Sequence, residues 1–153
     1  MILIKNTQKK IKINESKIKS KINLILKKLG YSNFDLSIWF TTNQTIRKFN
    51  KKFREKNKPT DILSFPFHEN IKPGQKIKIS NPEDKVLGDI IISLEYCKKD
   101  AQNSNLNFSD YLLRIIIHGI AHLLGFDHQT NEQFKKMNIF ENKLLKLLNI
   151  KMP

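Results

Sequence analysis

Residues 86–92 have the sequence VLGDIII, which is a nearly continuous apolar run. Such a run is typical of a strand that is buried on both faces of a sheet, so we expect it at the centre of the fold. Ser93 follows directly and can cap a helix. Further along, residues 111–124 are apolar almost all round, which predicts a buried helix that starts at Ser109 or Asp110.

Three further segments have the pattern of strands. Residues 2–5 and 34–40 show the period of two that half-buried strands have. Residues 61–67, with the sequence DILSFPF, are the third candidate, and Pro66 would end this strand because proline has no N–H for the ladder. A polar loop that contains proline separates this segment from residues 86–92.

Three more helices are indicated by apolar residues that recur at helical spacing. The first ends at Gly30, since glycine readily adopts the left-handed conformation that follows a helix. The second begins after Thr42 or Asn43, and the last opens with the capping-box pair Thr130 and Gln133. The apolar face of the second helix consists of Ile46, Phe49 and Phe53. The apolar stripe of the last helix consists of Phe134, Met137, Phe140, Leu144 and Leu147.

These segments follow one another in the order β-α-β-α-β-β-α-α-α. The order predicts an α+β fold in which about four strands form a mixed sheet packed with about five helices. A length of 153 residues suits one domain, so we expect a single domain over residues 1–153. We expect a cytoplasmic location without a membrane span, because residues 1–10 lack a signal-peptide segment and the lone Cys97 cannot form an internal disulfide bond.

The formal charge of the chain is +14, from 28 basic and 14 acidic side chains. A surplus of this size suggests a polyanionic partner. Residues 1–60 contain 16 basic and 3 acidic side chains, whereas residues 61–153 contain 12 and 11, so nearly all of the surplus lies in the first part. The alternative explanation is a lysine-rich composition without a functional cause, which should spread the charge evenly along the chain.

Three of the four histidines lie in residues 118–128, which have the sequence HGIAHLLGFDH. One histidine on an apolar helix is usually a core residue with a satisfied hydrogen bond, but three together indicate a shared task. His118 and His122 are four residues apart, so their rings leave the same face of a helix and can bind one ion. Gly125 can end the helix in the left-handed conformation, and the turn would bring His128 to the same ion.

Three neutral imidazoles leave one coordination position open. This is the arrangement of a catalytic zinc site, because a structural zinc usually has four protein ligands. We therefore expect one Zn²⁺ per chain, although nickel, copper or iron would also suit the ligands. Asp127, next to His128, could accept a hydrogen bond from a ligand imidazole, act as a fourth ligand under some conditions, or only cap the turn.

The spacing of the histidines matches the HExxHxxGxxH motif of zinc proteases. Those enzymes have a glutamate as general base directly after the first histidine, where this chain has Gly119. The metal ligands match, but the peptidase chemistry is disfavoured. A glycine inside a helix costs about 1 kcal/mol relative to alanine, so we expect a cause for it. Either a substrate or a neighbouring element would approach the helix closely at Gly119.

A second group of candidate residues lies in residues 53–67, FREKNKPTDILSFPF. Arg54, Lys56 and Lys58 precede a Pro-Thr-Asp turn that leads directly into a predicted strand. A guanidinium held there suits phosphate, because its forked donors match the phosphate oxygens. We predict that Arg54 is catalytic and binds substrate together with Lys56 and Lys58; a solvated basic loop is the alternative.

Together these motifs resemble the YbeY family of bacterial ribosomal-RNA maturation endoribonucleases. The resemblance rests on three blocks in the family's order, NKPTDILSFPF at 57–67, LGDIIIS at 87–93 and HGIAHLLGFDH at 118–128. The histidine block is the most specific, and LGDI alone would be weak. Ala121 and Phe126 stand where leucine and tyrosine are more usual, which concerns the shape of the pocket rather than the metal.

The resemblance implies zinc ligation by His118, His122 and His128, catalysis that depends on His118 and His122, and a role of Arg54 in RNA processing. It implies a metal-dependent, single-strand-specific endoribonuclease in 3′-end maturation of small-subunit ribosomal RNA and in ribosome quality control. The implied partners are ribosomal RNA and the small ribosomal subunit, with no DNA and no membrane. In the mechanism we expect, the metal activates a water or polarises a phosphoryl oxygen, while Arg54 neutralises charge on the phosphate.

Two other functions stay open at this point. The chain could be a ribosome-associated RNA-binding factor whose metal stabilises the fold, or, less favoured because of Gly119, a zinc metalloprotease. The nucleophile could be water or the 2′-hydroxyl of the RNA. Phe65, Phe67 or Phe126 could stack on bases, although we expect a core position for each.

Overall fold

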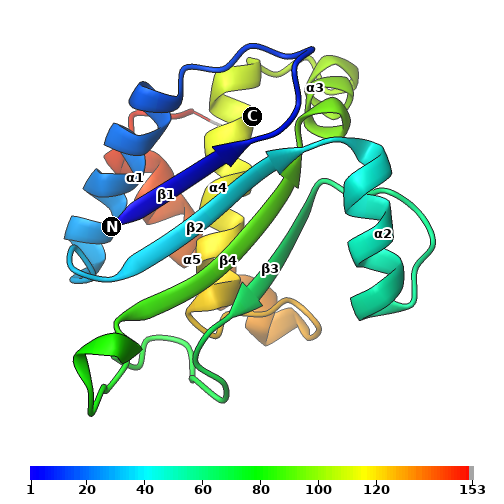
Figure 1. The fold of residues 1–153 in the computed structure, drawn as a ribbon. Helices are drawn as coiled ribbons and strands as arrows, with labels where there is room; N and C mark the ends of the chain where they lie inside the picture. The colour runs from blue at the N-terminus through cyan, green and yellow to red at the C-terminus, as the bar shows by residue number, and fades with distance from the viewer. Residues whose placement is uncertain (152–153) are drawn as a thin grey trace.

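The apolar run at residues 86–92 lies in the interior of a four-stranded mixed sheet, as its composition predicts (Figure 1). The computed structural model describes residues 1–151. The strands are β1 (Ile2–Asn6), β2 (Asp35–Thr41), β3 (Ile62–Pro66) and β4 (Val86–Ser93), in the spatial order β1-β2-β4-β3. β1, β2 and β4 are parallel, whereas β3 is an antiparallel edge strand paired with β4.

Five helices accompany the sheet, so the predicted α+β class and element order are confirmed. They are α1 (Glu15–Leu29), α2 (Asn43–Arg54), α3 (Leu94–Asn103), α4 (Phe108–Leu123) and α5 (Asn131–Leu147), with a short 3₁₀ turn, η1 (Pro82–Asp84). Thr130 and Gln133 form the predicted capping box of α5. The predicted start of α4 at Ser109 or Asp110 is wrong, because the side chain of Asn107 accepts the N–H of Asp110 and caps the helix at Phe108.

The two faces of the sheet are covered unequally. Alternating strand residues such as Ile38, Ile62 and Ile90 point into the main core, which also contains buried residues of α1, α4 and α5. The opposite face has only a small buried cluster, Ile46, Leu63 and Ile91, where α2 packs on it. Figure 1 shows α4 and α5 behind the sheet, α1 beside and behind β1, and α2 at the opposite edge, beside β3.

The buried stripe of α5 differs in part from the predicted one. It runs through Met137, the half-buried Glu141 and Leu144 to Leu148, which caps the end of the helix, at spacings of four, three and four. Leu147 lies off this line, and Phe134, in the first turn, is 58% exposed, so the core positions predicted for both residues are wrong. A carboxylate, Glu141, therefore stands in the middle of an otherwise apolar stripe.

Within residues 1–151, no helix combines the length and the hydrophobicity that a membrane span requires.

Candidate metal centre

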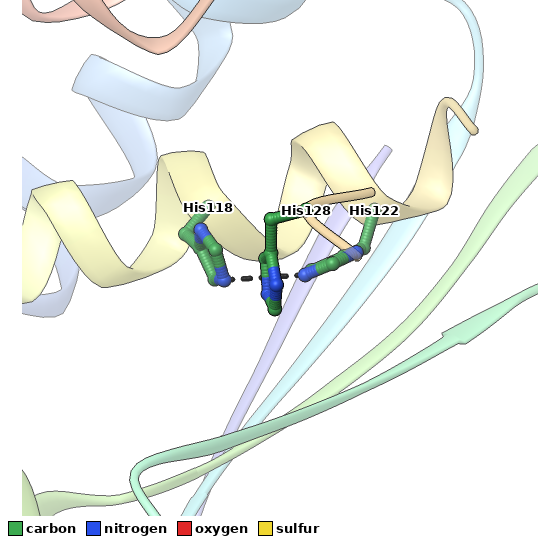
Figure 2. A group of neighbouring side chains, drawn as sticks. All are labelled: His118, His122 and His128. Atoms are coloured by element: carbon green, nitrogen blue, oxygen red, sulfur yellow. Dashed lines mark hydrogen bonds between the residues drawn. The ribbon is translucent and has the colours of Figure 1, made fainter. Parts of the chain in front are cut away.

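Three imidazoles converge at the C-terminal end of α4 (Figure 2). His118 and His122 lie one turn apart, and their Nε2 atoms are 3.1 Å from each other. The ring of His128 is 5.5 Å from that of His118 and 5.2 Å from that of His122, measured between centroids. One nitrogen of each residue lies within 4.8 Å of the other two, so the group could hold a metal ion.

The turn that returns His128 to the helix depends on Gly125. Its φ of +91° is in the left-handed region, as predicted, and its N–H donates to the carbonyl of His122 at 3.1 Å. A side chain at this position would also collide with the backbone carbonyl of Ile71. The next residue, Phe126, is buried and stacks on Phe140 of α5 with centroids 4.3 Å apart, so its predicted core position is confirmed.

The hydrogen bonds that the two Nδ1 atoms make turn both Nε2 atoms toward each other. The Nδ1 of His122 lies 3.0 Å from the carbonyl oxygen of Phe126, which can only accept, so Nδ1 has the proton. The Nδ1 of His118 lies 3.1 Å from a carboxylate oxygen of Glu141 and donates to it in the same way. When both imidazoles are neutral, the two Nε2 atoms are unprotonated and face each other at 3.1 Å, where a cation between them would bind both.

The donor set fits zinc. Two ligand nitrogens at the usual bond length in a tetrahedron lie about 3.4 Å apart, close to the 3.1 Å between His118 and His122. Burial, and then the charges of His118 and His128, lower the pKa of His122, so the neutral imidazole that a metal requires is favoured. His128 is exposed, which leaves the cluster open to solvent on one side.

Glu141 is the site residue that the sequence analysis missed. It comes from α5, and its side chain is only 15% exposed where it contacts His118. A carboxylate that receives the second ring N–H of a metal ligand fixes the orientation of the ring and raises its basicity. Its position on the stripe of α5 was a detectable signal, because a charged residue there interrupts apolar positions.

The side chain of Asp127 accepts a hydrogen bond from the backbone and not from a ligand imidazole. Its Oδ1 accepts the backbone N–H of His128 at 2.7 Å, an arrangement that caps the turn. Such a bond acts on the backbone that presents His128.

The presence of Gly119 has a packing cause. A Cβ atom there would lie 2.7 Å from Cδ1 of Ile62 and 2.9 Å from Cδ1 of Ile90, so a larger residue would force the ends of these two side chains to move, and glycine allows the close approach of α4 to the sheet without that shift.

Arg54, Lys56 and Lys58 lie outside the histidine cluster. Arg54 is the last residue of α2, and all three side chains are exposed. The segment after α2 is fastened by the buried Asn50, whose Nδ2 donates to the carbonyl of Lys58 at 2.9 Å. α2 packs on one face of β3 and α4 on the other, so β3 is the element that joins the two groups of candidate residues.

The basic residues of the first part of the chain do not form one patch. Five of them lie on α1, next to β1, namely Lys17, Lys19, Lys21, Lys27 and Lys28. Another five lie on α2, next to β3, namely Arg47, Lys48, Lys51, Lys52 and Arg54. β1 and β3 are the opposite edges of the sheet, so the two groups of basic residues lie far from each other. Of the two, only the α2 group adjoins β3. For the α1 group, a lysine-rich composition without a functional cause is a sufficient explanation.

The fold and the cluster define a class of protein: an α+β domain with a three-histidine centre, able to hold a metal ion, at the end of a buried helix. The family model described as Endoribonuclease YbeY matches residues 3–149. This chain belongs to the YbeY family, as its motifs predict.

Individual relatives agree with this assignment. The chain is 38% identical to the Endoribonuclease YbeY of Homo sapiens over 136 residues, which covers 89% of this chain and 81% of that protein. It is 41% identical to the Endoribonuclease YbeY of Pelagibacter ubique over 145 residues, or 94% of this chain and 90% of that protein. A solution structure from Thermotoga maritima matches with a TM-score of 0.62 and 25% identity, over 97% of this chain and 92% of that one.

Proposed function

We propose that this protein is a metal-dependent endoribonuclease that cleaves single-stranded RNA, in 3′-end maturation of small-subunit ribosomal RNA and in ribosome quality control. The single observation that supports it best is the convergence of three imidazoles whose free nitrogens face one point beside an exposed side. Relatives over most of the chain have the name Endoribonuclease YbeY. The proposal treats residues 1–153 as one catalytic domain.

In this proposal His118, His122 and His128 would hold one zinc ion per chain. The ion would supply Lewis-acid chemistry at the scissile phosphate. Glu141 and the carbonyl of Phe126 orient two of the imidazoles, so the ligands are held ready without rearrangement. Asp127 holds the backbone at His128. The exposed ring of His128 marks the side on which the RNA backbone would approach.

The basic residues at the end of α2 and just after it would bind the phosphates of the RNA. Arg54 would bind a phosphate with its forked guanidinium, and Lys56 and Lys58 would attract the strand through their charge. We propose ribosomal RNA on the small ribosomal subunit as the substrate, and hence the cytoplasm as the place of action. DNA and membranes are not expected partners.

A cleavage assay on purified protein tests the proposal. Zinc-loaded protein should cut an end-labelled single-stranded RNA, lose this activity with a chelator and regain it when zinc is added. Circular dichroism of the metal-free form must show that it is still folded. A folded, metal-free protein that cuts as fast as the zinc form would contradict a catalytic metal. A zinc-loaded protein that binds the RNA and leaves it intact would instead support the RNA-binding factor.

The ends of the products identify the nucleophile. A 2′,3′-cyclic phosphate would indicate attack by the 2′-hydroxyl of the RNA, whereas a 5′-phosphate fragment would indicate attack by water.

A further inference from the structure

The open face of the sheet contains a groove that the function proposed above does not use. Its volume is about 420 Å³, and it extends over all four strands to α2. Figure 1 shows β1 and β2 on this side of the sheet without a helix in front of them. The side chains that matter here are Leu3, Lys5, Trp39, Phe49, Phe53 and Phe65.

Four aromatic rings follow one another along this groove. Trp39 meets Phe49 edge to face at 5.5 Å between centroids, and Phe49 is stacked with Phe53 at 6.2 Å. Phe53 then meets Phe65 of β3 at 5.2 Å. Phe53 is 54% exposed although it is a large apolar side chain. A contiguous row of partly exposed rings is unusual for a surface without a partner.

Lysine side chains accompany these rings. The Nζ of Lys5 lies 4.8 Å from the ring centroid of Trp39, and the Nζ of Lys52 lies 5.3 Å from that of Phe53. α2, which forms one wall, has five basic residues and no acidic one. Asp89 is the one acidic residue among those that line the groove. The charge of this surface therefore suits an anionic partner that also offers flat apolar faces.

The row of aromatic rings continues toward the metal centre. Phe67 comes two residues after Phe65, just beyond the end of β3, and it is 50% exposed, so the core position expected for it is wrong. Its ring contacts that of His68 at 5.0 Å, and His68 lines a cavity of about 380 Å³ together with His122. Because β3 is the edge strand, an extended ligand can pass from the groove around this edge to the histidines.

We propose that this groove binds the bases of single-stranded RNA, which stack on Trp39 and Phe53 while Lys5 and Lys52 bind neighbouring phosphates. Stacking on aromatic rings in a basic groove is how proteins hold single strands without regard to sequence. The inference rests on the proposed function, since it names the surface that delivers the strand to the histidine centre.

Trp39 makes the proposal directly measurable, because it is the one tryptophan of the chain. Zinc-loaded, full-length protein is titrated with a single-stranded 2′-O-methyl oligonucleotide of about ten nucleotides, within the usual site sizes. We expect saturable quenching of the tryptophan emission. Phe53→Ala should weaken binding about tenfold, since loss of one stacked base has an effect of this order.

Phe134→Ala is the matched control. Phe134 is as exposed as Phe53, at 58%, but it lies on α5 and outside the groove. The Phe134→Ala variant should bind the oligonucleotide with the affinity of the wild type. Circular dichroism should show that the Phe53→Ala and Phe134→Ala variants are both folded. Absence of quenching, or equal affinities of the Phe53→Ala and Phe134→Ala variants, would overturn the proposal. The groove would then be a candidate binding site for a protein partner.

A parallel cleavage assay separates this proposal from the one it rests on. If the wild type cuts RNA while the Phe53→Ala variant binds the oligonucleotide with unchanged affinity, the proposal that the groove binds RNA is wrong and the proposed endoribonuclease activity is supported. If the oligonucleotide quenches the emission of Trp39 and binding depends on Phe53, but the protein cuts no RNA, the groove binds RNA as proposed and the proposed endoribonuclease activity is wrong.

Discussion

α2 and α4 pack on opposite faces of the same edge strand, yet they differ in almost every property. α4 buries ten of its 16 residues, and at its C-terminal end it presents two of the histidines. α2 buries only Ile46 and Asn50, and it has five basic residues and no acidic one. The difference teaches that a metal centre and a polyanion surface have opposite requirements. Ligand geometry needs a rigid, packed support, whereas phosphate contacts need exposed, charged side chains.

The division predicts two kinds of variant. Changes on the α4 side should alter metal content and cleavage together, whereas changes on the α2 side should alter cleavage and leave the metal in place.

The largest effect is expected for His118→Ala. Two imidazoles would remain for the metal, and Glu141 would lose its partner, so zinc content and RNA cleavage should both fall to background. Elemental analysis and the cleavage assay measure these quantities on the same sample. His68→Ala is the control for zinc content alone, because His68 contacts the carbonyl of Asp84 and is not among the three clustered histidines. Cleavage by a metal-free His118→Ala protein would refute the site assignment.

Arg54→Ala tests the α2 side. Loss of a charged phosphate contact is worth about 1.5–3 kcal/mol, so cleavage should slow roughly 10- to 100-fold, with one zinc still bound. Lys27→Ala is the control, since it removes a positive charge from α1, next to the opposite edge of the sheet. If Arg54→Ala cleaves as fast as Lys27→Ala, Arg54 has no phosphate role and the basic loop is only solvated.

Much of this division could be predicted from the sequence, because it depends on local patterns. The period of two and the helical spacing gave the order of the elements, and the continuous run at 86–92 placed β4 inside the sheet. The four-residue spacing of His118 and His122, followed by Gly125, predicted the convergence of the histidines. These features need only neighbours in the chain.

Features that depend on tertiary contacts were not predictable in this way. Glu141 meets His118 across 23 residues because α5 packs on α4, and no local pattern states that pairing. The exposure of Phe134 is likewise not visible in the helical spacing, which puts this residue on the apolar stripe. The spacing around Gly119 indicates that something approaches the helix closely, but only the tertiary structure shows that side chains of the sheet, those of Ile62 and Ile90, lie there.

Glu141→Gln should have a smaller effect than the loss of a ligand. The amide can still accept from Nδ1 of His118, but it is neutral, so the imidazole becomes a weaker donor to the metal. Loss of such a partner usually lowers metal affinity about 10- to 100-fold. Competition with a chromophoric chelator measures this, with Glu132→Gln on the exposed first turn of α5 as control. Equal zinc affinities in the two variants would limit Glu141 to packing.

The smallest effect is expected for Asp127→Asn, which sharpens the boundary of the metal centre. The Oδ1 of asparagine can still accept the N–H of His128, so the turn should persist and zinc affinity should fall only slightly. Asp127→Ala removes that bond, at a cost of about 1 kcal/mol, or roughly fivefold in affinity if the turn must be ordered when zinc binds. Chelator competition on both variants compares them. If the asparagine variant loses zinc as readily as Glu141→Gln, the charge of Asp127 acts on a ligand, and the rigid α4 side then has two carboxylates rather than one.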